Sequence, residues 1–307
     1  MTVIERLSSA EGVREPRIAG FEARQSGNAS GLWYDFATNP DGRVAVVIGS
    51  CAAAGDAHRL RSGTTSRLRD GADPADLLSG LEFGTASVLA AVIDRNASLM
   101  SYGSIGSAAP ALSAPELPHR VLRPTGGRLE SVALPAGSTV LLSTHGKTPP
   151  DPWPASNERI FEDLLAGNHG IVVVLYRHPP APLDLTVPAE PASLAVVRNQ
   201  LRTWLGRTGA DEETCADILL AVGEAATNAA EHAHDGSGRP VRITVRADLD
   251  DGVLRFTVSD NGSWKTPTPS SGYRGHGIRL MRALVDGVDV TTTSEGTTVQ
   301  MLKELTG

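Results

Sequence analysis

Several features are scarce in this sequence of 307 residues, and each scarcity excludes a class of protein. The two cysteines, Cys51 and Cys215, lie far apart and form no CxxC or metal-ligand spacing. A disulfide framework is therefore excluded, and a reducing compartment is favoured. The longest apolar runs, such as residues 171–176, are far shorter than the roughly 20 residues that cross a membrane. Residues 1–7 contain no apolar signal segment, so we expect a cytoplasmic protein without a membrane partner.

A surplus of basic residues is also missing. Lys and Arg number 28 against 35 Asp and Glu, which leaves a net charge of −7. Such a chain has no basic excess to neutralise nucleic-acid phosphates, so we expect no nucleic-acid partner. Its hydrophobic share of 40% is ordinary for a globular protein, and its length predicts two domains of about 150 residues each.

A proline-rich segment over residues 179–191 marks the clearest boundary, because proline fixes φ and removes an N–H donor. We expect an N-terminal tail over 1–16, a first domain over 17–178, a linker over 179–191, and a second domain over 183–307 whose start overlaps the linker. Before this boundary, short β-branched runs alternate with Gly and Pro, which predicts a sheet domain. Its expected strands are 43–49, 85–94, 98–103, 138–144 and 171–176, and its expected helices are 56–81 and 157–166.

The pattern changes after the boundary. Apolar residues at spacings of three and four predict two consecutive helices, 193–208 and 212–234. Alternating runs joined by turn residues then predict two hairpins, separated by a loop and a helix. The expected strands are 241–248, 253–259, 288–293 and 297–302, with the loop over 261–275 and the helix over 276–285. The second domain is thus predicted to be an α/β sandwich.

The predicted helix over 212–234 carries a polar stripe. Glu224, Asn228 and His232 recur every four residues and so project from one face. Alone, such a stripe is typical of a solvated helix face. Two later features favour a binding site: residues 260–262 (Asp-Asn-Gly) directly follow a strand, and glycines at 272, 275 and 277 surround a helix start whose free N–H groups can receive phosphate.

In this order the segments resemble the nucleotide-binding boxes of the GHKL ATPase superfamily, in its branch of anti-sigma-factor serine kinases. The matching residues are 224–233, 260–262, 275–286 and 296–299. The resemblance implies a Bergerat-type α/β sandwich that uses ATP and Mg²⁺. One departure is Trp264, which stands where the family often has the second glycine of Asp-x-Gly-x-Gly, so a different geometry of the nucleotide lid is expected.

The resemblance also implies a role for each matching residue. Asn228 is the implied Mg²⁺ ligand, and Glu224 is the implied general base that accepts the proton of an attacking serine hydroxyl. Asp260 would accept a hydrogen bond from the adenine amine. The remaining implied nucleotide-binding residues are Gly262 and either Thr298 or its neighbour Thr297 near the base, and Gly275 and Gly277 at the phosphates.

The first domain resembles the SpoIIE-like metal-dependent serine phosphatases, which belong to the PPM phosphatases. The matching residues are 31–35, 40–49, 83–94, 101–110 and 134–142. The resemblance implies a β-sandwich with flanking helices. Those enzymes use aspartates to hold two divalent cations that activate a water molecule.

The aspartates of that metal site are largely replaced in this chain. Ser50 stands at one aspartate position, His145 at the aspartate of a Thr-Asp-Gly turn, and Asn168-His169 at a terminal Asp-Asp pair. Asp35 and Asp56 are too few to hold a two-metal cluster. We therefore expect an inactive phosphatase domain, and the alternative is a rearranged metal site that uses His145 and His169.

Together these patterns predict an α+β protein, with a PPM phosphatase-like β-sandwich followed by a GHKL α/β sandwich. The implied function is that of an ATP-dependent protein serine kinase and anti-sigma factor. Its implied partners are an anti-sigma factor antagonist of the STAS type that bears the target serine, an alternative sigma factor, and a second copy in a homodimer. One alternative is a non-catalytic, ATP-gated protein that sequesters a sigma factor or antagonist, and another is an active serine phosphatase.

Overall fold

The computed structural model describes residues 18–305, except 19, 27–30, 40, 81, 116, 124–128, 155, 169, 235–239 and 265–275. The chain forms two compact units, Met1–His178 and Pro179–Gly307. Among the described helices, none is both long enough and apolar enough to cross a bilayer.

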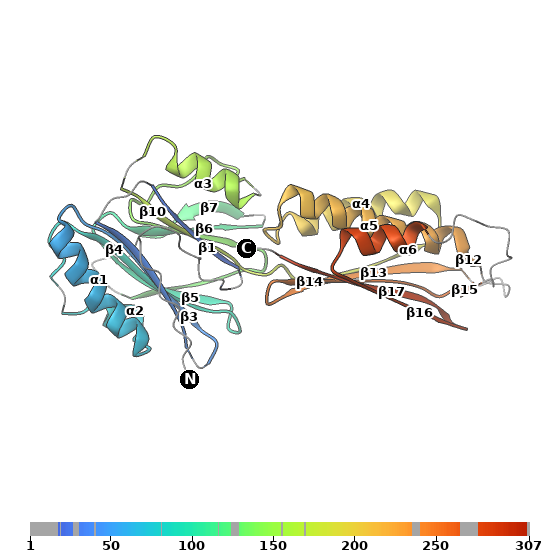
Figure 1. The fold of residues 1–307 in the computed structure, drawn as a ribbon, viewed down its shortest axis with the longest axis horizontal. Helices are drawn as coiled ribbons and strands as arrows, with labels where there is room; N and C mark the ends of the chain where they lie inside the picture. The colour runs from blue at the N-terminus through green and yellow to red at the C-terminus, as the bar shows by residue number, and fades with distance from the viewer. Residues whose placement is uncertain are drawn as a thin grey trace. The chain divides into compact units, whose positions relative to one another are not determined.

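The N-terminal unit is a sandwich of two antiparallel five-stranded sheets (Figure 1). One sheet has the order β2-β3-β4-β5-β8, formed by Leu32–Thr38, Val44–Ser50, Ser87–Asp94, Leu99–Ile105 and Glu130–Ala133. The other has the order β1-β10-β9-β6-β7, formed by Phe21–Gln25, Val172–Arg177, Thr139–Ser143, Ala109–Ala114 and Leu117–Val121. Their inner faces share one apolar core that includes Val46, Leu89, Leu142 and Val174.

Helices cover the outer faces of this sandwich. The helices α1 (Ala54–Arg69) and α2 (Pro74–Leu78) pack on the β2-β3-β4-β5-β8 sheet, and α3 (Asn157–Leu165) packs on the other sheet. The single helix predicted over 56–81 is wrong: Pro74 begins a second helix, capped by the Asp73 side chain, which accepts from the Asp76 N–H.

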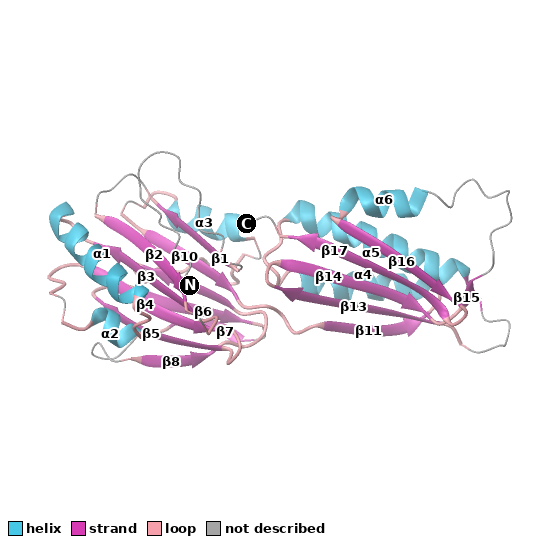
Figure 2. Ribbon diagram, turned by 60° about the horizontal axis from the view of Figure 1, so that its bottom comes forward, coloured by secondary structure: helices cyan, strands magenta, loops and turns pink. Residues whose placement is uncertain are grey.

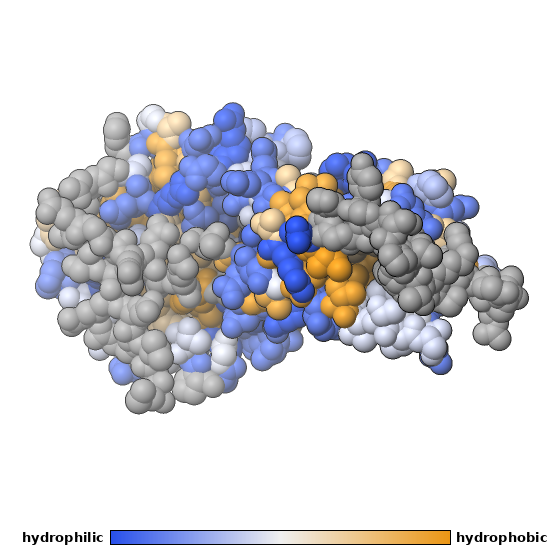
Figure 3. Space-filling model, turned by 45° about the vertical axis from the view of Figure 1, so that its right-hand side comes forward, coloured by the Kyte–Doolittle hydropathy of each residue, from blue (hydrophilic) through white to orange (hydrophobic). Residues whose placement is uncertain are grey.

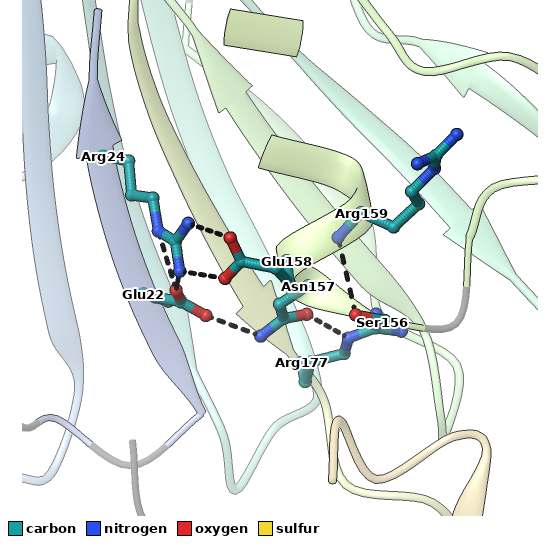
Figure 4. A network of polar contacts seen from close by, with 7 residues as sticks. All are labelled: Glu22, Arg24, Ser156, Asn157, Glu158, Arg159 and Arg177. Atoms are coloured by element: carbon teal, nitrogen blue, oxygen red, sulfur yellow. Dashed lines mark hydrogen bonds and ion pairs between the residues drawn. The ribbon is translucent and has the colours of Figure 1, made fainter. Parts of the chain in front are cut away.

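A network of polar side chains holds α3 against the sheet (Figure 4). The buried Arg177 guanidinium donates from Nε to the Asn157 side chain at 2.9 Å, and the Asn157 amide donates to Glu22 at 3.0 Å. Arg24 bridges Glu22 and Glu158. Burial lowers the pKa of Arg177 to about 10, and the nearby Glu22 carboxylate partly opposes that shift.

The C-terminal unit is a five-stranded antiparallel sheet with helices on one face (Figure 2). The strand order is β11-β13-β14-β17-β16, formed by Leu183–Pro188, Arg242–Asp250, Val253–Asp260, Gly296–Glu304 and Gly287–Thr293. The covering helices are α4 (Pro191–Leu205), α5 (Glu212–His232) and α6 (His276–Leu284). These architectures confirm the predicted fold class, a β-sandwich with flanking helices followed by an α/β sandwich.

Three predicted boundaries in this unit need correction. The linker over 179–191 is shorter than predicted, because Leu183, Leu185 and Val187 alternate and pair with β13 as an edge strand. The helix predicted to end at 234 ends at His232 and continues into β12 (Ala233–His234). The loop predicted over 261–275 begins with β15 (Ser263–Trp264), which pairs with β12.

Candidate nucleotide site

The helix α5 places the predicted base and the predicted metal ligand on one half-buried face. Glu224 and Asn228 are four residues apart, so they lie one turn apart along the same side of the helix. The neighbouring side of the helix buries Ala225 and Ala229 in the apolar core against the sheet. Small alanines let the helix approach the strands closely, which fixes the polar face at the edge of the core.

The start of α6 meets both side chains at Gly277. A Cβ atom at this position would lie 2.5 Å from the Glu224 Oε1 atom and 3.2 Å from the Asn228 amide nitrogen. A glycine allows this close approach without displacing the Glu224 carboxylate, so the structure brings Gly277, Glu224 and Asn228 together as predicted residues of one site. The N-terminus of a helix also carries a partial positive charge, which favours an anion there.

A second group of predicted residues gathers around Asp260 at the end of β14. The carboxylate accepts the Gly262 N–H at 2.9 Å and also the backbone N–H of Thr297. Burial raises the pKa of Asp260, and these two N–H donors partly oppose that shift. A Cβ atom at Gly296, whose φ is +142°, would lie 1.9 Å from the Asp260 carbonyl oxygen, so this close approach requires glycine.

The structure separates the two threonines that the sequence left open. Thr297 has the same strand parity as Val299 and Met301, which point into the core beneath the helices, and it is 8% exposed. Thr298 pairs with Ser259 and Thr291, and its side chain lies on the opposite face of the sheet from Asp260. The candidate contact to a base is therefore Thr297 rather than Thr298.

The pairing of β12 with β15 brings the two groups to one end of the unit. The strand β12 directly follows α5, and β15 directly follows the Asp260–Gly262 turn. Ala233 pairs with Trp264 and His234 with Ser263, so the end of α5 is tied to the end of β14. Gly275 and Gly272 lie outside the described residues.

The donor set of this site fits Mg²⁺ and ATP. The Glu224 carboxylate and the Asn228 side-chain carbonyl are hard oxygen groups of the kind Mg²⁺ prefers. Gly277 lets the start of α6 lie directly beside these two side chains, and a helix N-terminus is suited to phosphate. Asp260 offers a half-buried acceptor next to the buried Thr297, which suits recognition of an amine on a base.

In the N-terminal unit, the two aspartates that the sequence retains near the expected phosphatase metal site are engaged by other side chains. Asp35 is bound by the Arg61 guanidinium, with both contacts at 3.3 Å, and by the Thr65 hydroxyl at 2.7 Å. Asp56 is exposed and pairs with Arg59. In the described part of the chain, no three His, Cys, Asp or Glu side chains are grouped so that they could hold a metal ion.

Other side chains occupy the positions at which the phosphatase aspartates are replaced. Burial and the nearby Lys147 charge lower the pKa of His145. The Lys147 ammonium donates to the Asn168 side chain, and Ser50 pairs with Ser87 across the sheet. His169, the other histidine of the rearranged-site alternative, lies outside the described residues.

Comparison with known proteins places the C-terminal unit. Residues 187–303 match the model of the histidine kinase-like ATPase domain. The serine-protein kinase RsbW of Bacillus velezensis is 31% identical over 140 residues, which cover 41% of this chain and 86% of that protein. The chain belongs to the RsbW family. The RsbW of Bacillus subtilis is likewise 31% identical, over 142 residues and 86% of its length.

Solved structures resemble both units. The RsbU and RsbW domains of Rv1364c from Mycobacterium tuberculosis share 22% identity, cover 94% of each chain and give a TM-score of 0.49. The phosphatase domain of SpoIIE from Bacillus subtilis shares 14% identity, covers 51% of this chain and 90% of that one, and gives a TM-score of 0.33. The family relationship predicted from residues 224–299 is confirmed, and the ATPase-domain match agrees with the predicted use of ATP.

Proposed function

We propose that the C-terminal unit is an ATP- and Mg²⁺-dependent protein serine kinase and anti-sigma factor, and that it phosphorylates a STAS-type anti-sigma factor antagonist. The observation that carries this proposal is the approach of Gly277 to Glu224 and Asn228, which groups the proposed base, the proposed metal ligand and the start of a helix. The relatives named as serine-protein kinases support it.

Each side chain then has a defined task. Bound ATP with Mg²⁺ supplies the phosphoryl group and neutralises its charge. Asn228 would hold the metal ion, and Glu224 would accept the proton of the substrate hydroxyl. Asp260 and Thr297 would hold the base, while Gly262 and Gly277 leave room for the backbone to approach the nucleotide.

The surface beside Glu224, the proposed general base, suits a protein substrate. Leu220 lies one helical turn before Glu224 on the same side of α5 and is 50% exposed. Leu280 on α6, one turn after Gly277, is 36% exposed. Figure 3 shows apolar areas at the surface of the molecule. Exposed apolar side chains next to a catalytic carboxylate favour a protein substrate over a small polar one.

The kinase proposal is tested by label transfer from γ-labelled ATP to a purified STAS-type antagonist. We expect Glu224→Gln to abolish transfer while ATP still binds, and Asn228→Ala to weaken both. Glu231→Gln is the matched control, because Glu231 is an exposed glutamate on the same helix. Transfer that survives both Glu224→Gln and Asn228→Ala would refute the assignment. ATP binding without phosphoserine on the antagonist would favour the ATP-gated sequestering protein instead.

We also propose that the N-terminal unit is a phosphatase-like domain without phosphatase activity. The pairing of Asp35 with Arg61 and Thr65 supports this, because a carboxylate neutralised by a guanidinium is a poor metal ligand. Release of phosphate from a phosphoserine peptide, assayed in Mn²⁺ and Mg²⁺, should not exceed the rate without protein. Metal-dependent release above that rate would restore the active-phosphatase alternative. The alternative sigma factor and a homodimer complete the proposed set of partners.

A further inference from the structure

An open cavity of about 420 Å³ lies in the N-terminal unit, lined by residues 104–109 and by Arg123. Its volume is within the range of small-ligand pockets. No carboxylate is among the described residues that line it. A cavity with a guanidinium and no acidic side chain selects an anion over a neutral or cationic ligand.

The wall of this cavity is rigid at the turn between β5 and β6. The Ser107 and Ser87 hydroxyls are 2.9 Å apart, and the Ser107 hydroxyl donates to the Thr144 carbonyl at 3.2 Å. Gly106 has a φ of +74°, and a Cβ there would lie 2.7 Å from the Ala86 carbonyl oxygen. The turn is therefore fixed before any ligand arrives, which limits the entropy lost on binding.

The same wall touches the turn over 144–146, which stands in place of the phosphatase Thr-Asp-Gly turn. A Cβ on Gly146 would lie 3.1 Å from the Ser107 carbonyl and 3.4 Å from the Ala109 side chain. Lys147 follows directly and adds a second positive charge at this end of the sandwich. The cavity thus borders the place where the resemblance puts the lost metal ions.

Arg123 has donors to spare. Its side chain is exposed, and it makes no hydrogen bond or ion pair with any residue that the structure describes. Arg120, also exposed, lies three residues earlier on β7 and does not line the cavity. An unpaired guanidinium presents a planar fork of N–H groups that matches two phosphate oxygens.

We propose that this cavity binds a phosphomonoester group without hydrolysing it, and that the group is phosphoserine on a protein phosphorylated by the C-terminal unit. The Arg123 guanidinium and the Ser104 hydroxyl, which both line the cavity, hold the phosphate, while the loss of the metal-binding aspartates leaves no activated water. The source of the phosphoserine rests on the proposed kinase function, whereas the anion site itself rests on the cavity and Arg123 alone. The N-terminal unit is then a reader of the kinase product.

The test is fluorescence anisotropy with the full chain in EDTA, using a labelled peptide with a central phosphoserine and its unphosphorylated twin. We expect the phosphopeptide to bind at least about tenfold more tightly than the twin. Arg123→Gln should remove this difference, and Arg120→Gln, which removes the same charge nearby, should retain it. Thermal unfolding of each variant shows that the fold is intact.

Several results would overturn the proposal. They are equal affinity for the two peptides, an unchanged preference in Arg123→Gln, an equal loss in Arg120→Gln, or no phosphopeptide binding at millimolar concentration. Inorganic phosphate is the competitor: if it binds as tightly as the phosphopeptide, the ligand is free phosphate and the protein-borne source is wrong. Glu224→Gln should bind the phosphopeptide normally, which keeps failure of this inference distinct from failure of the kinase proposal.

Discussion

Replacing Gly277 by alanine places a methyl group against the Glu224 carboxylate. The new Cβ would lie 2.5 Å from Oε1, whereas an ordinary contact needs about 3.5 Å, so the carboxylate must move by about 1 Å. The carboxylate is the far end of a flexible side chain and can move without unfolding the helix. A misplacement of about 1 Å at a catalytic group costs about 100-fold in rate, and we expect kcat to fall by that factor.

The stability of this variant should change in the opposite direction. Alanine is favoured over glycine within a helix by up to about 1 kcal/mol, so the midpoint of thermal unfolding should hold or rise. The matched control is Gly223→Ala, next to Glu224 on α5, where an added Cβ meets nothing within 4 Å. It should gain similar stability with kcat unchanged.

The assays are label transfer to the antagonist for kcat, binding of a fluorescent ATP analogue for affinity, and circular dichroism for unfolding. A folded Gly277→Ala variant with unchanged kcat would refute the reasoning, because the close approach to Glu224 would then have no catalytic consequence. Equal losses in Gly223→Ala would refute it as well.

Three further predictions concern the buried polar groups. Burial raises the pKa of Asp260, so its ionisation costs stability as pH rises through that pKa. The Asp260→Asn variant should therefore unfold at no lower a temperature at neutral pH, yet bind ATP at least about tenfold more weakly. In the wild type, acid should weaken ATP binding at a pH above the ordinary Asp pKa of about 3.9. Asn157→Ala removes an acceptor from the buried Arg177 and should cost about 1–3 kcal/mol in urea unfolding, whereas the exposed Arg159→Ala should cost under about 0.5. Burial and the Arg95 charge lower the pKa of His178, so below about pH 6.5 this histidine is protonated in the unfolded chain but still neutral in the native chain. The free energy of unfolding should therefore fall as pH drops through that value. Unfolding midpoints should show a smaller fall in His178→Gln.

The elements that the sequence predicts well are those with a strong local pattern. The run from Val253 to Ser259 alternates apolar and polar residues, and it forms β14 with Leu254, Phe256 and Val258 in the core. The strands that escaped prediction are mostly short or lie at sheet edges, such as β7, whose residues Leu117–Val121 contain a proline and no alternation. Their existence depends on partners distant in sequence, which propensity alone does not reveal.

The candidate site shows the same division between local and distant information. The parity of Thr297 with Val299 and Met301 was readable in the sequence and could have decided between the two threonines. By contrast, Asp35 on a strand accepts hydrogen bonds from Arg61 and Thr65 on a helix, 26 and 30 positions later in the sequence. Only the folded chain shows that this carboxylate is already neutralised.

The Asp260 carboxylate is held differently from two carboxylates of the N-terminal unit whose pKa values are lowered. In the N-terminal unit, the Arg24 guanidinium lowers the pKa of Glu158, and a backbone N–H and the side chain of Arg43 lower that of Asp41. In the C-terminal unit, burial raises the pKa of Asp260, and its partners are backbone N–H groups rather than a cation. Burying a carboxylate without a cationic partner costs stability. Proteins retain such a cost where function requires an acceptor that no cation neutralises. If Asp260 served only the fold, asparagine would serve at least as well there, so Asp260→Asn must combine undiminished stability with a loss of ATP affinity.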